Sequence, residues 1–277
     1  MGNADLTVRF WGVRGSIAAG GPEVAAVGGN TSCVEVRVGD ELIVFDGGTG
    51  LRALGAESRP SEANLFFSHV HWDHIQGFPF FAPAFVPGNH FTLHGPGRNG
   101  AQLLLALEKQ MQPPTFPVTL SQMGATLDFA GVADGDVIQV GAARVVARAL
   151  NHPQGCFGYR VELGGKSVVY ATDFEPLADG ASSPSALALA ANADVLICDA
   201  QYTADEYEGR SGPARRGWGH NTVHHATRLA QEAGVGTLVL FHHDPAHDDA
   251  MIGRLEELAQ QEYLGSVAAR EGLRIAV

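Results

Sequence analysis

The chain has 277 residues, of which 45% are hydrophobic and 17% are charged, and its formal net charge is −12. This composition is typical of a folded globular protein and excludes an intrinsically disordered chain. The sequence contains only two lysines, Lys109 and Lys166, and its one short basic cluster lies at 210–216. Because a surface that binds many phosphates needs clustered lysine and arginine, we expect a small substrate and no large nucleic acid among the partners.

The sequence also bears on location and domain organisation. No basic segment followed by an apolar core opens the chain, and no apolar run reaches about 18 residues, so we expect no signal peptide, no membrane span and no membrane partner. Cys33, Cys156 and Cys198 are scattered and odd in number, which argues against a disulfide framework and favours the reducing cytoplasm. No linker or low-complexity stretch divides the chain, so we expect residues 1–277 to form one domain.

Strands and helices alternate along the chain. In the first half, the apolar patterns predict strands at 6–11, 31–38, 41–46 and 63–67, a short helix after 47–50, a helix that opens at 75–81, a strand at 91–94 and a helix at 99–111. The proline-rich stretch 112–117 cannot be regular structure and is either a connector or a lid. In the second half, the patterns predict hairpins at 137–150 and 157–172, strands at 194–198 and 237–241, and helices at 185–193, 222–233 and 248–263. This order indicates a layered α/β protein.

The strongest chemical signal is His-x-His-x-Asp-His at positions 69–74, directly after an apolar strand. Side chains alternate along a strand, so His69, His71 and Asp73 should lie on one side, and His74 should turn back into the same space. Nitrogen and oxygen ligands spaced so closely suit zinc or a related divalent ion. The pattern resembles the metallo-β-lactamase superfamily, in which it supplies ligands to a dinuclear metal site.

Three more polar residues follow apolar strands, namely His152, Asp173 and His242. Strand ends of this kind converge on one edge of a sheet, where α/β proteins place their sites. The expected ligands are His69, His71 and His152 for one ion, and Asp73, His74 and His242 for the other, with Asp173 as the bridge because a carboxylate has two oxygens.

Plainer interpretations of these residues remain open. His152 precedes Pro153 and also fits a loop histidine, and Asp173 also fits a helix cap. Two neighbouring histidines compete for the last ligand position. We prefer His242, which comes first after the strand, and keep His243 as a candidate substrate contact.

Later segments narrow the resemblance. Gly-Tyr-Arg at 158–160, Thr-Asp at 172–173 and Gly-His-Asn-Thr at 219–222 look like the branch of the superfamily that contains tRNase Z and the cyclic phosphodiesterases. The resemblance implies a four-layer αββα metallo-β-lactamase sandwich in which His220 assists proton transfer and Asp199 orients it. The expected catalytic residues are therefore Asp73, His220 and Asp199. A helix cap for His220 and a simple supporting hydrogen bond for Asp199 remain the alternatives. The chain lacks the long Gly/Pro-rich basic arm with which tRNase Z grips tRNA, which again argues against a large RNA.

Residues outside the motif complete the expected site. Asn30, Thr31 and Ser32 follow a glycine-rich loop and are candidates to hydrogen-bond a phosphoryl oxygen, although such residues in turns also satisfy their own backbone. Asp46, at the end of a predicted strand, is expected as a buried support for the motif loop.

The leading hypothesis is a dinuclear metal-dependent hydrolase, namely a phosphodiesterase for a small, cyclic nucleotide or a similar phosphodiester. Two divalent ions, with zinc favoured and manganese or iron left open, would activate the attacking water between them, and His220 would protonate the leaving oxygen. A hydrolase of a thioester, lactone or β-lactam, a metal-binding sensor without turnover and a redox di-iron protein are the alternatives. Homodimer formation is expected from the family resemblance alone.

Overall fold

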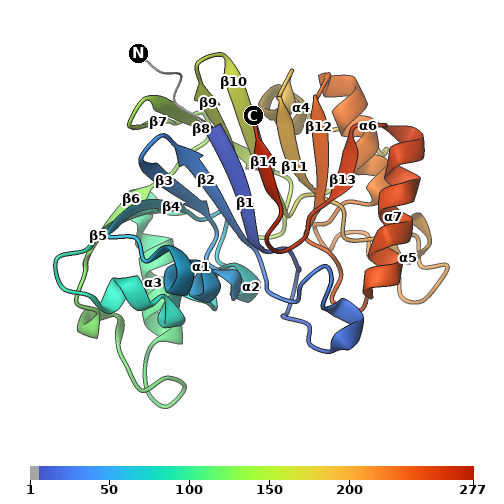
Figure 1. Cartoon of the computed structure of the whole chain (residues 1–277). Helices are drawn as coiled ribbons and strands as arrows, with labels where there is room; N and C mark the ends of the chain where they lie inside the picture. Colours follow the sequence, from blue (N-terminus) through green and yellow to red (C-terminus); the bar gives the residue numbers. More distant parts are fainter. Residues whose placement is uncertain (1–5) are drawn as a thin grey trace.

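Two β-sheets pack face to face, and helices cover the outer face of each sheet (Figure 1). The computed structural model describes residues 6–277. Each sheet has seven strands, so the order of layers is helix, sheet, sheet, helix. The predicted four-layer αββα sandwich is therefore confirmed. Among residues 6–277 no helix combines the length and apolar character needed to cross a bilayer.

The first half of the chain builds one sheet, to which the last strand, β14, adds an edge; the order is β14-β1-β2-β3-β4-β5-β6. Neighbours are antiparallel from β14 to β3 and parallel from β3 to β6. Its strands are β1 (Leu6–Gly12), β2 (Cys33–Val38), β3 (Glu41–Phe45), β4 (Glu62–Phe66), β5 (His90–Gly95), β6 (Thr126–Gly131) and β14 (Arg274–Ala276). The associated helices are α1 (Gly50–Ser58), α2 (Trp72–Ile75) and α3 (Ala101–Gln110), with short 3-10 helices at Pro22–Val24, Phe78–Phe80, Ala82–Phe85, Arg98–Gly100 and Leu120–Gln122.

The second half repeats this plan in the order β13-β12-β11-β10-β9-β8-β7. Pairs from β7 to β10 are antiparallel, and pairs from β10 to β13 are parallel. Its strands are β7 (Val137–Val140), β8 (Ala143–Leu150), β9 (Cys156–Leu163), β10 (Lys166–Ala171), β11 (Val195–Asp199), β12 (Thr237–Phe241) and β13 (Ser266–Ala268). Its helices are α4 (Pro184–Ala190), α5 (Ala204–Tyr207), α6 (Val223–Ala233) and α7 (Asp249–Glu262).

The core between the sheets joins the two halves of the chain. The ring of Phe45 on β3 stacks on Tyr170 of β10 at 5.0 Å and on Tyr159 of β9 at 5.5 Å between centroids. All three side chains are fully buried. A second cluster, which includes Leu54 of α1 and Leu103 of α3, packs between the first sheet and its helices. Burial of each such side chain contributes about 1.5–3 kcal/mol, so both layers of core stabilise the edge that carries the polar motifs.

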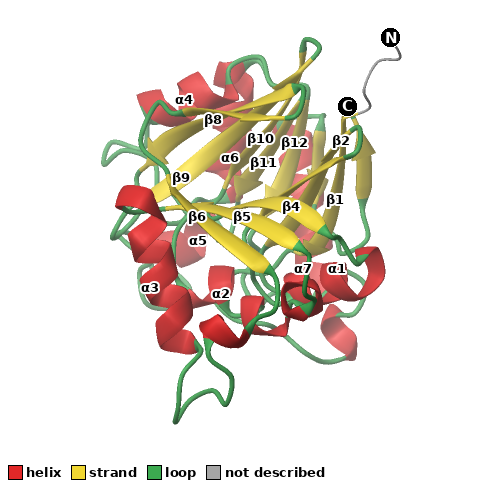
Figure 2. Cartoon of the chain, turned by 90° about the vertical axis from the view of Figure 1, so that its left-hand side faces the viewer, coloured by secondary structure: helices red, strands yellow, loops and turns green. Residues whose placement is uncertain are grey.

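The structure differs from the predicted elements mainly at weak patterns. The helix expected to open at 75–81 begins at Trp72 and ends at Ile75, because Gly77 and Pro79 interrupt it and a 3-10 turn follows. Strand β6 was not predicted, because its residues are only partly buried and show no clear apolar alternation. The short strands β13 and β14 and the single turn of α5 were also missed. The stretch 112–117 is irregular, as predicted, and it extends from the end of α3 (Figure 2).

Candidate metal centre

The polar residues of the site follow strands that end at one edge of the two sheets. Strands β3 and β4 are parallel, and β8, β10, β11 and β12 all run in one direction, so the carboxyl ends within each group meet. Three of the residues just after these ends, Asp46, Asp173 and His242, have positive φ angles of 58°, 56° and 62°. Non-glycine residues adopt this conformation at some cost, and such residues cluster at functional sites. The chain therefore turns sharply at each strand end and directs the side chain across the edge.

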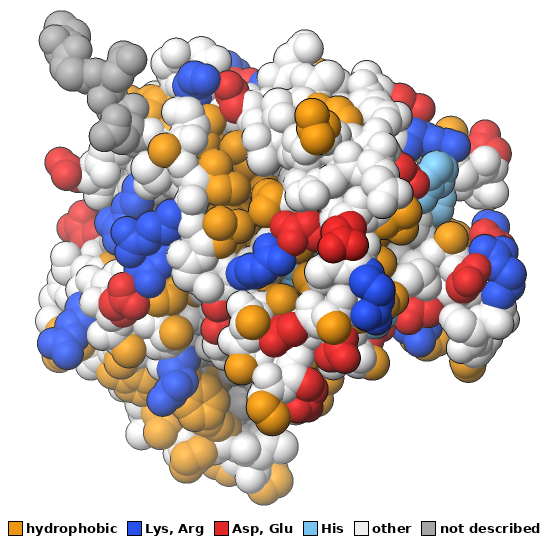
Figure 3. Space-filling model, turned by 45° about the vertical axis from the view of Figure 1, so that its right-hand side comes forward, with side chains coloured by type: hydrophobic (Ala, Val, Ile, Leu, Met, Phe, Trp, Pro, Cys, Tyr) orange, Lys and Arg blue, Asp and Glu red, His pale blue; other side chains and the backbone are white. Residues whose placement is uncertain are grey.

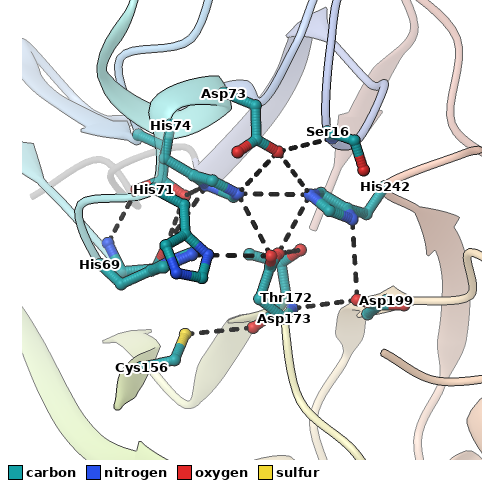
Figure 4. Close-up of polar contacts among 12 residues, drawn as sticks. Ser16, His69, His71, Asp73, His74, Cys156, Thr172, Asp173, Asp199 and His242 are labelled. Carbon is teal, nitrogen blue, oxygen red and sulfur yellow. Dashed lines mark hydrogen bonds and ion pairs between the residues drawn. The ribbon is translucent and has the colours of Figure 1, made fainter. Parts of the chain in front are cut away.

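Two groups of donor atoms that match the expected ligand sets form at this edge (Figure 4), and a third, overlapping group joins Asp173 and His242 to Asp199 and His220. The first group consists of His69, His71 and His152, and the second of Asp73, His74, Asp173 and His242. Within each group the donor atoms lie within 4.8 Å of one another. These are the two sets expected from the sequence, although their role as metal ligands stays a prediction.

Asp173 lies between the two groups. Its Oδ2 is 3.7 Å from Nε2 of His69 in the first group and 3.3 Å from Nε2 of His74 in the second. Its Oδ1 is 3.2 Å from Nε2 of His242. A carboxylate in this position reaches donor atoms of both sets, as the bridging role requires.

The donor atoms fit divalent cations better than they fit one another. Nε2 of His152 faces Nδ1 of His71 at 3.2 Å, and Nε2 of His242 faces Nε2 of His74 at 3.2 Å. Two imidazole nitrogens that face each other share at most one proton. Nε2 of His69 is buried without a hydrogen-bond partner among residues 6–277. Imidazole and carboxylate donors suit divalent metals, so the His/Asp cluster can bind them.

The protonation states agree with this fit. Burial, together with the neighbouring His74, lowers the pKa of His69 well below its usual value, and burial likewise lowers the pKa of His152. These rings are therefore neutral, which is the form that coordinates metals. Burial alone would lower the pKa of His74, but Asp73, Asp173 and Asp46 raise it well above its usual value. A cation bound in the second group would satisfy the same carboxylates that otherwise hold a proton on His74.

Each candidate histidine ligand has a partner for its other ring nitrogen. The pairs are His69 Nδ1 with Ser68 Oγ at 3.1 Å, His71 Nε2 with Gln154 Oε1 at 2.8 Å, His74 Nδ1 with Asp46 Oδ2 at 2.7 Å, His152 Nδ1 with the Gly219 carbonyl at 2.9 Å, and His242 Nδ1 with Gln201 Oε1 at 3.2 Å. Such partners set the tautomer and the orientation of the ring, so that the opposite nitrogen faces the metal.

Asp46 and Asp199 are fully satisfied by protein donors. Asp46 accepts hydrogen bonds from the Ser68 amide at 2.7 Å, the Ser68 hydroxyl at 2.8 Å, His74 Nδ1 at 2.7 Å and the Tyr170 hydroxyl at 2.7 Å. Asp199 accepts from His220 Nδ1 at 2.8 Å and, at 3.1 Å each, from the amides of Asp173, Gln201 and Asn221. The donors bond to Asp46 once at Oδ1 and three times at Oδ2, and to Asp199 twice at each oxygen, which favours a supporting role for both carboxylates. For Asp46 this is the role that the sequence predicted.

His220 and Asp199 form a pair beside the two donor groups. Because Asp199 holds Nδ1 of His220, the other ring nitrogen, Nε2, is the one left for a substrate. Burial lowers the pKa of His220, but Asp199 and the carboxylates of Asp173 and Asp73 outweigh this effect and raise it to about 9. A histidine that carries a proton under these conditions is suited to act as a general acid.

Two glycines make room for candidate ligands. A Cβ atom on Gly15 would lie 2.4 Å from the ring of His242, and one on Gly219 would lie 2.1 Å from Nδ1 of His152. The hydrogen bonds to Gln201 and Gly219 hold these rings, so neither ring can move away freely. These glycines are necessary for the geometry, a requirement that no sequence pattern revealed.

The expected substrate contacts are engaged with or enclosed by the protein itself. Asn30 donates from Nδ2 to Glu271 Oε2 at 3.0 Å, Thr31 accepts from the Thr49 amide at 2.9 Å, and Ser32 is fully buried. These side chains brace the glycine-rich loop, because each is engaged with or enclosed by protein. His243 is also buried and its Nε2 pairs with the Ala269 carbonyl at 3.0 Å. Burial lowers the pKa of His243 to about 3. The assignment of these residues as substrate contacts stays a prediction, to which these protein partners lend no support.

Other contributors were missed by the sequence reasoning. The amide of Ser16, whose φ is 63°, donates to Asp73 Oδ2 at 2.7 Å (Figure 4). The Ser16 hydroxyl accepts a hydrogen bond from Gln201 at 3.1 Å, and Gln201 also contacts His242. The sequence contains one signal for the two glutamines: Gln154 lies two residues after His152, and Gln201 lies two residues after Asp199.

The fold and the donor groups define a metallo-β-lactamase-fold hydrolase with a His/Asp cluster that can bind metal. The family described as "Beta-lactamase superfamily domain" matches residues 42–243, so the chain belongs to this superfamily. The chain is 27% identical over 267 residues to Ribonuclease Z of Limosilactobacillus reuteri (strain DSM 20016), which covers 77% of this chain and 82% of that protein.

Solved structures show the same fold. The metallo-beta-lactamase fold protein YhfI from Bacillus subtilis has a TM-score of 0.74 and 20% identity, with 99% of this chain and 100% of that chain covered. Human tRNase Z, short form, has a TM-score of 0.65 and 19% identity, with 97% of this chain and 98% of that chain covered.

These relatives correct one expectation. The sequence predicted no large nucleic acid among the partners, but the relatives include a ribonuclease Z and a tRNase Z, enzymes whose names place RNA among their substrates. The prediction was wrong because net charge describes the whole surface and not the site. On the face shown in Figure 3, small groups of basic side chains lie among acidic ones, so phosphate contacts do not need a basic protein.

The hydrogen bond from Tyr170 to Asp46 gives a test of the support network. Tyr170→Phe and Tyr159→Phe each remove one buried hydroxyl, and each hydroxyl donates one bond of 2.7 Å. We expect both variants to lose about 1–2 kcal/mol of unfolding free energy in a denaturant titration. Only Tyr170→Phe should weaken zinc binding, by about 10-fold in competition with a chromophoric chelator, because Asp46 orients His74. Equal zinc affinities in the two variants would contradict this role of Asp46.

Gly15 gives a test of the space around His242. We expect Gly15→Ala to displace the His242 ring and to lower the affinity for the ion of the second donor group by at least about 10-fold. Gly20→Ala is the matched control, because a Cβ atom there meets nothing within 4 Å. The measurement is a zinc titration of both variants by calorimetry. A Gly15→Ala protein that binds zinc like the wild type would show that the His242 ring does not need the space at Gly15.

Proposed function

We propose that this protein is a metal-dependent phosphodiesterase that holds two divalent ions, with zinc favoured. The observation that carries the proposal is the arrangement of two donor groups linked by Asp173, with the His220–Asp199 pair beside them. A pair of bound divalent ions supplies an activated water and offsets charge on phosphoryl oxygens.

The residues divide the work as follows. The histidines of the two groups, with Asp73 and Asp173, hold the ions, and their partners fix the rings. The carboxylate of Asp199 accepts the hydrogen bond from Nδ1 of His220, so Nε2 is the nitrogen that is left to face the substrate. In the protonated form, Nε2 donates its proton to the departing oxygen of the ester, and the orientation of the ring by Asp199 allows this without rearrangement.

The substrate class that we propose is a nucleotide phosphodiester. Small cyclic nucleotides and RNA share this linkage, and the similarity to Ribonuclease Z places RNA among the substrates to be tried. The His220–Asp199 pair favours this chemistry over thioester hydrolysis, because an alkoxide leaving group needs a proton donor at neutral pH whereas a thiolate does not. The similarity to Ribonuclease Z favours it over lactone and β-lactam hydrolysis.

Substrate comparison and metal removal test the proposal. We expect hydrolysis of bis(p-nitrophenyl) phosphate and no comparable turnover of nitrocefin or an acyl thioester. Dialysis against a chelator should abolish the activity and zinc, manganese or iron should restore it, with about two ions per chain at full activity by elemental analysis. Turnover of the thioester or of nitrocefin in place of the phosphodiester would overturn the proposal.

His220 gives a separate test of proton donation. We expect His220→Ala to keep its metal content and to lose about 10²- to 10⁴-fold in kcat for an unactivated linear dinucleotide, whose alkoxide leaving group needs a proton; the loss for bis(p-nitrophenyl) phosphate, whose p-nitrophenolate leaves without one, should be smaller. His224→Ala is the matched control, because this exposed histidine near the start of α6 pairs with Glu262 and lies outside the donor groups. A His220→Ala enzyme with the kcat of the wild type for the dinucleotide would show that the ring is no more than a structural cap.

A further inference from the structure

A cavity of about 590 Å³ lies beside the metal-site motif. Three aromatic side chains line it: Trp72 of α2, Phe80 of the following 3-10 helix and Phe116 of the proline-rich stretch. Trp72 is 65% exposed and Phe80 is 56% exposed. Large aromatic side chains are seldom left so open next to a site unless something packs on them.

The position of Trp72 ties the cavity to the reaction site. Trp72 stands between His71 and Asp73, one from each donor group, so its Cα is about 3.8 Å from theirs. Gln76 caps the end of α2, where its backbone amide donates to the Trp72 carbonyl, and its side chain also lines the cavity. The backbone therefore joins the cavity directly to the motif, although none of the seven candidate ligands lines the cavity.

The cavity carries positive charge in an acidic protein. Arg52 and Lys109 line it, and its lining contains no aspartate or glutamate. The other lysine, Lys166, is paired with Asp194 at 2.9 Å, whereas neither Arg52 nor Lys109 forms an ion pair within residues 6–277. Two unpaired cations beside aromatic rings suit a ligand that has both an anionic and an aromatic part.

Amide groups add hydrogen-bonding capacity. Gln76 donates to the Thr31 hydroxyl at 3.2 Å and Gln110 donates to the Ile75 carbonyl at 2.9 Å. These bonds use the amide nitrogens and leave the carbonyl oxygens without a donor in the described part of the chain. Such oxygens accept hydrogen bonds from the amino and imino groups of a base.

The proline-rich stretch forms one wall of the cavity. The ring of Phe116 packs edge-on against Phe80 with 5.6 Å between centroids, and Thr115 also lines the space. The stretch that the sequence left open as a connector or a lid therefore shapes this cavity.

We propose that the cavity is a subsite for the nucleobase of the nucleotide next to the scissile phosphate. The base stacks on Trp72 and Phe116, the glutamine oxygens accept from its edge, and Arg52 and Lys109 pair with a neighbouring phosphate. The inference rests on the proposed function, of which it specifies the substrate. Packing of a second copy of the chain on this aromatic face is the competing explanation.

Equilibrium binding separates the base from the phosphate. Adenosine 5′-monophosphate and ribose 5-phosphate differ only in the base, and calorimetry on the metal-loaded protein compares them without any need for turnover. We expect the wild type to bind the nucleotide about 5- to 150-fold more tightly, the factor typical of one base stacked on an aromatic side chain. Trp72→Ala should remove this preference and leave the affinity for ribose 5-phosphate unchanged.

Trp218→Ala is the matched control, because Trp218 is the other exposed tryptophan at 53% and does not line the cavity. It should keep the preference, and Phe116→Ala should reduce it in part. Equal binding of the two ligands by the wild type, or a preference that survives Trp72→Ala, overturns the subsite. A change from dimer to monomer in light scattering, with the preference for the nucleotide intact in Trp72→Ala, would also overturn the subsite. That result would show that Trp72 packs against a second copy of the chain.

Failure of the proposed function looks different. If the protein prefers the nucleotide through Trp72 but does not hydrolyse bis(p-nitrophenyl) phosphate, the base subsite stands and the phosphodiesterase assignment falls. If it hydrolyses the ester without a preference for the nucleotide, the subsite falls alone.

Discussion

The site depends on four buried carboxylates that lie together at the edge of the two sheets, those of Asp46, Asp73, Asp173 and Asp199. Taking an ionised carboxylate out of water costs several kcal/mol unless hydrogen bonds or opposite charges compensate for it. Asp46 and Asp199 are compensated by four protein donors each. Asp73 and Asp173 have few such donors and face imidazole nitrogens, most of which are turned toward one another. Positive charge between Asp73, Asp173 and the imidazole nitrogens would compensate for the burial of these two carboxylates. This need distinguishes Asp73 and Asp173, the candidate ligands, from Asp46 and Asp199, the supports.

The two-sheet architecture makes this concentration of charge possible. Asp46 follows β3 of the first sheet, whereas Tyr170, which donates to it, belongs to β10 of the second. The same tyrosine stacks on Phe45, so the hydrophobic contact between the sheets and the support of the motif loop share one side chain. Displacement of one sheet relative to the other would therefore disturb both the core and the orientation of His74. The sharp turns with positive φ at Asp46, Asp173 and His242 are tolerated because this packing holds them.

Much of the site could be predicted from the sequence, because the information was local. The hexad lies within one strand end and one turn, and β12 runs over the predicted residues directly into His242. Features that depend on contacts between distant segments could not be predicted. The glycine that makes room for His242 lies at position 15, and the amide that binds Asp73 belongs to Ser16. His243 shows how little adjacency in sequence says about a side chain: it follows a candidate ligand, but the turn directs its ring into the interior, where it meets Ala269.

The net charge led to the one expectation that the relatives contradict, namely that no large nucleic acid is among the partners. The formal net charge of −12 counts carboxylates that are buried at the site, and two divalent ions bound there would bring it to about −8. The remaining acidic side chains act on a phosphate mainly when they lie within a Debye length of about 8 Å, so the composition of the immediate surroundings decides whether a nucleotide is repelled. Beside the motif those surroundings are Arg52, Lys109 and three aromatic rings, with no carboxylate in the lining. An acidic protein can thus present a locally cationic, aromatic approach to its reaction site, and affinity for a nucleotide then comes from stacking and two nearby charges instead of from a basic surface.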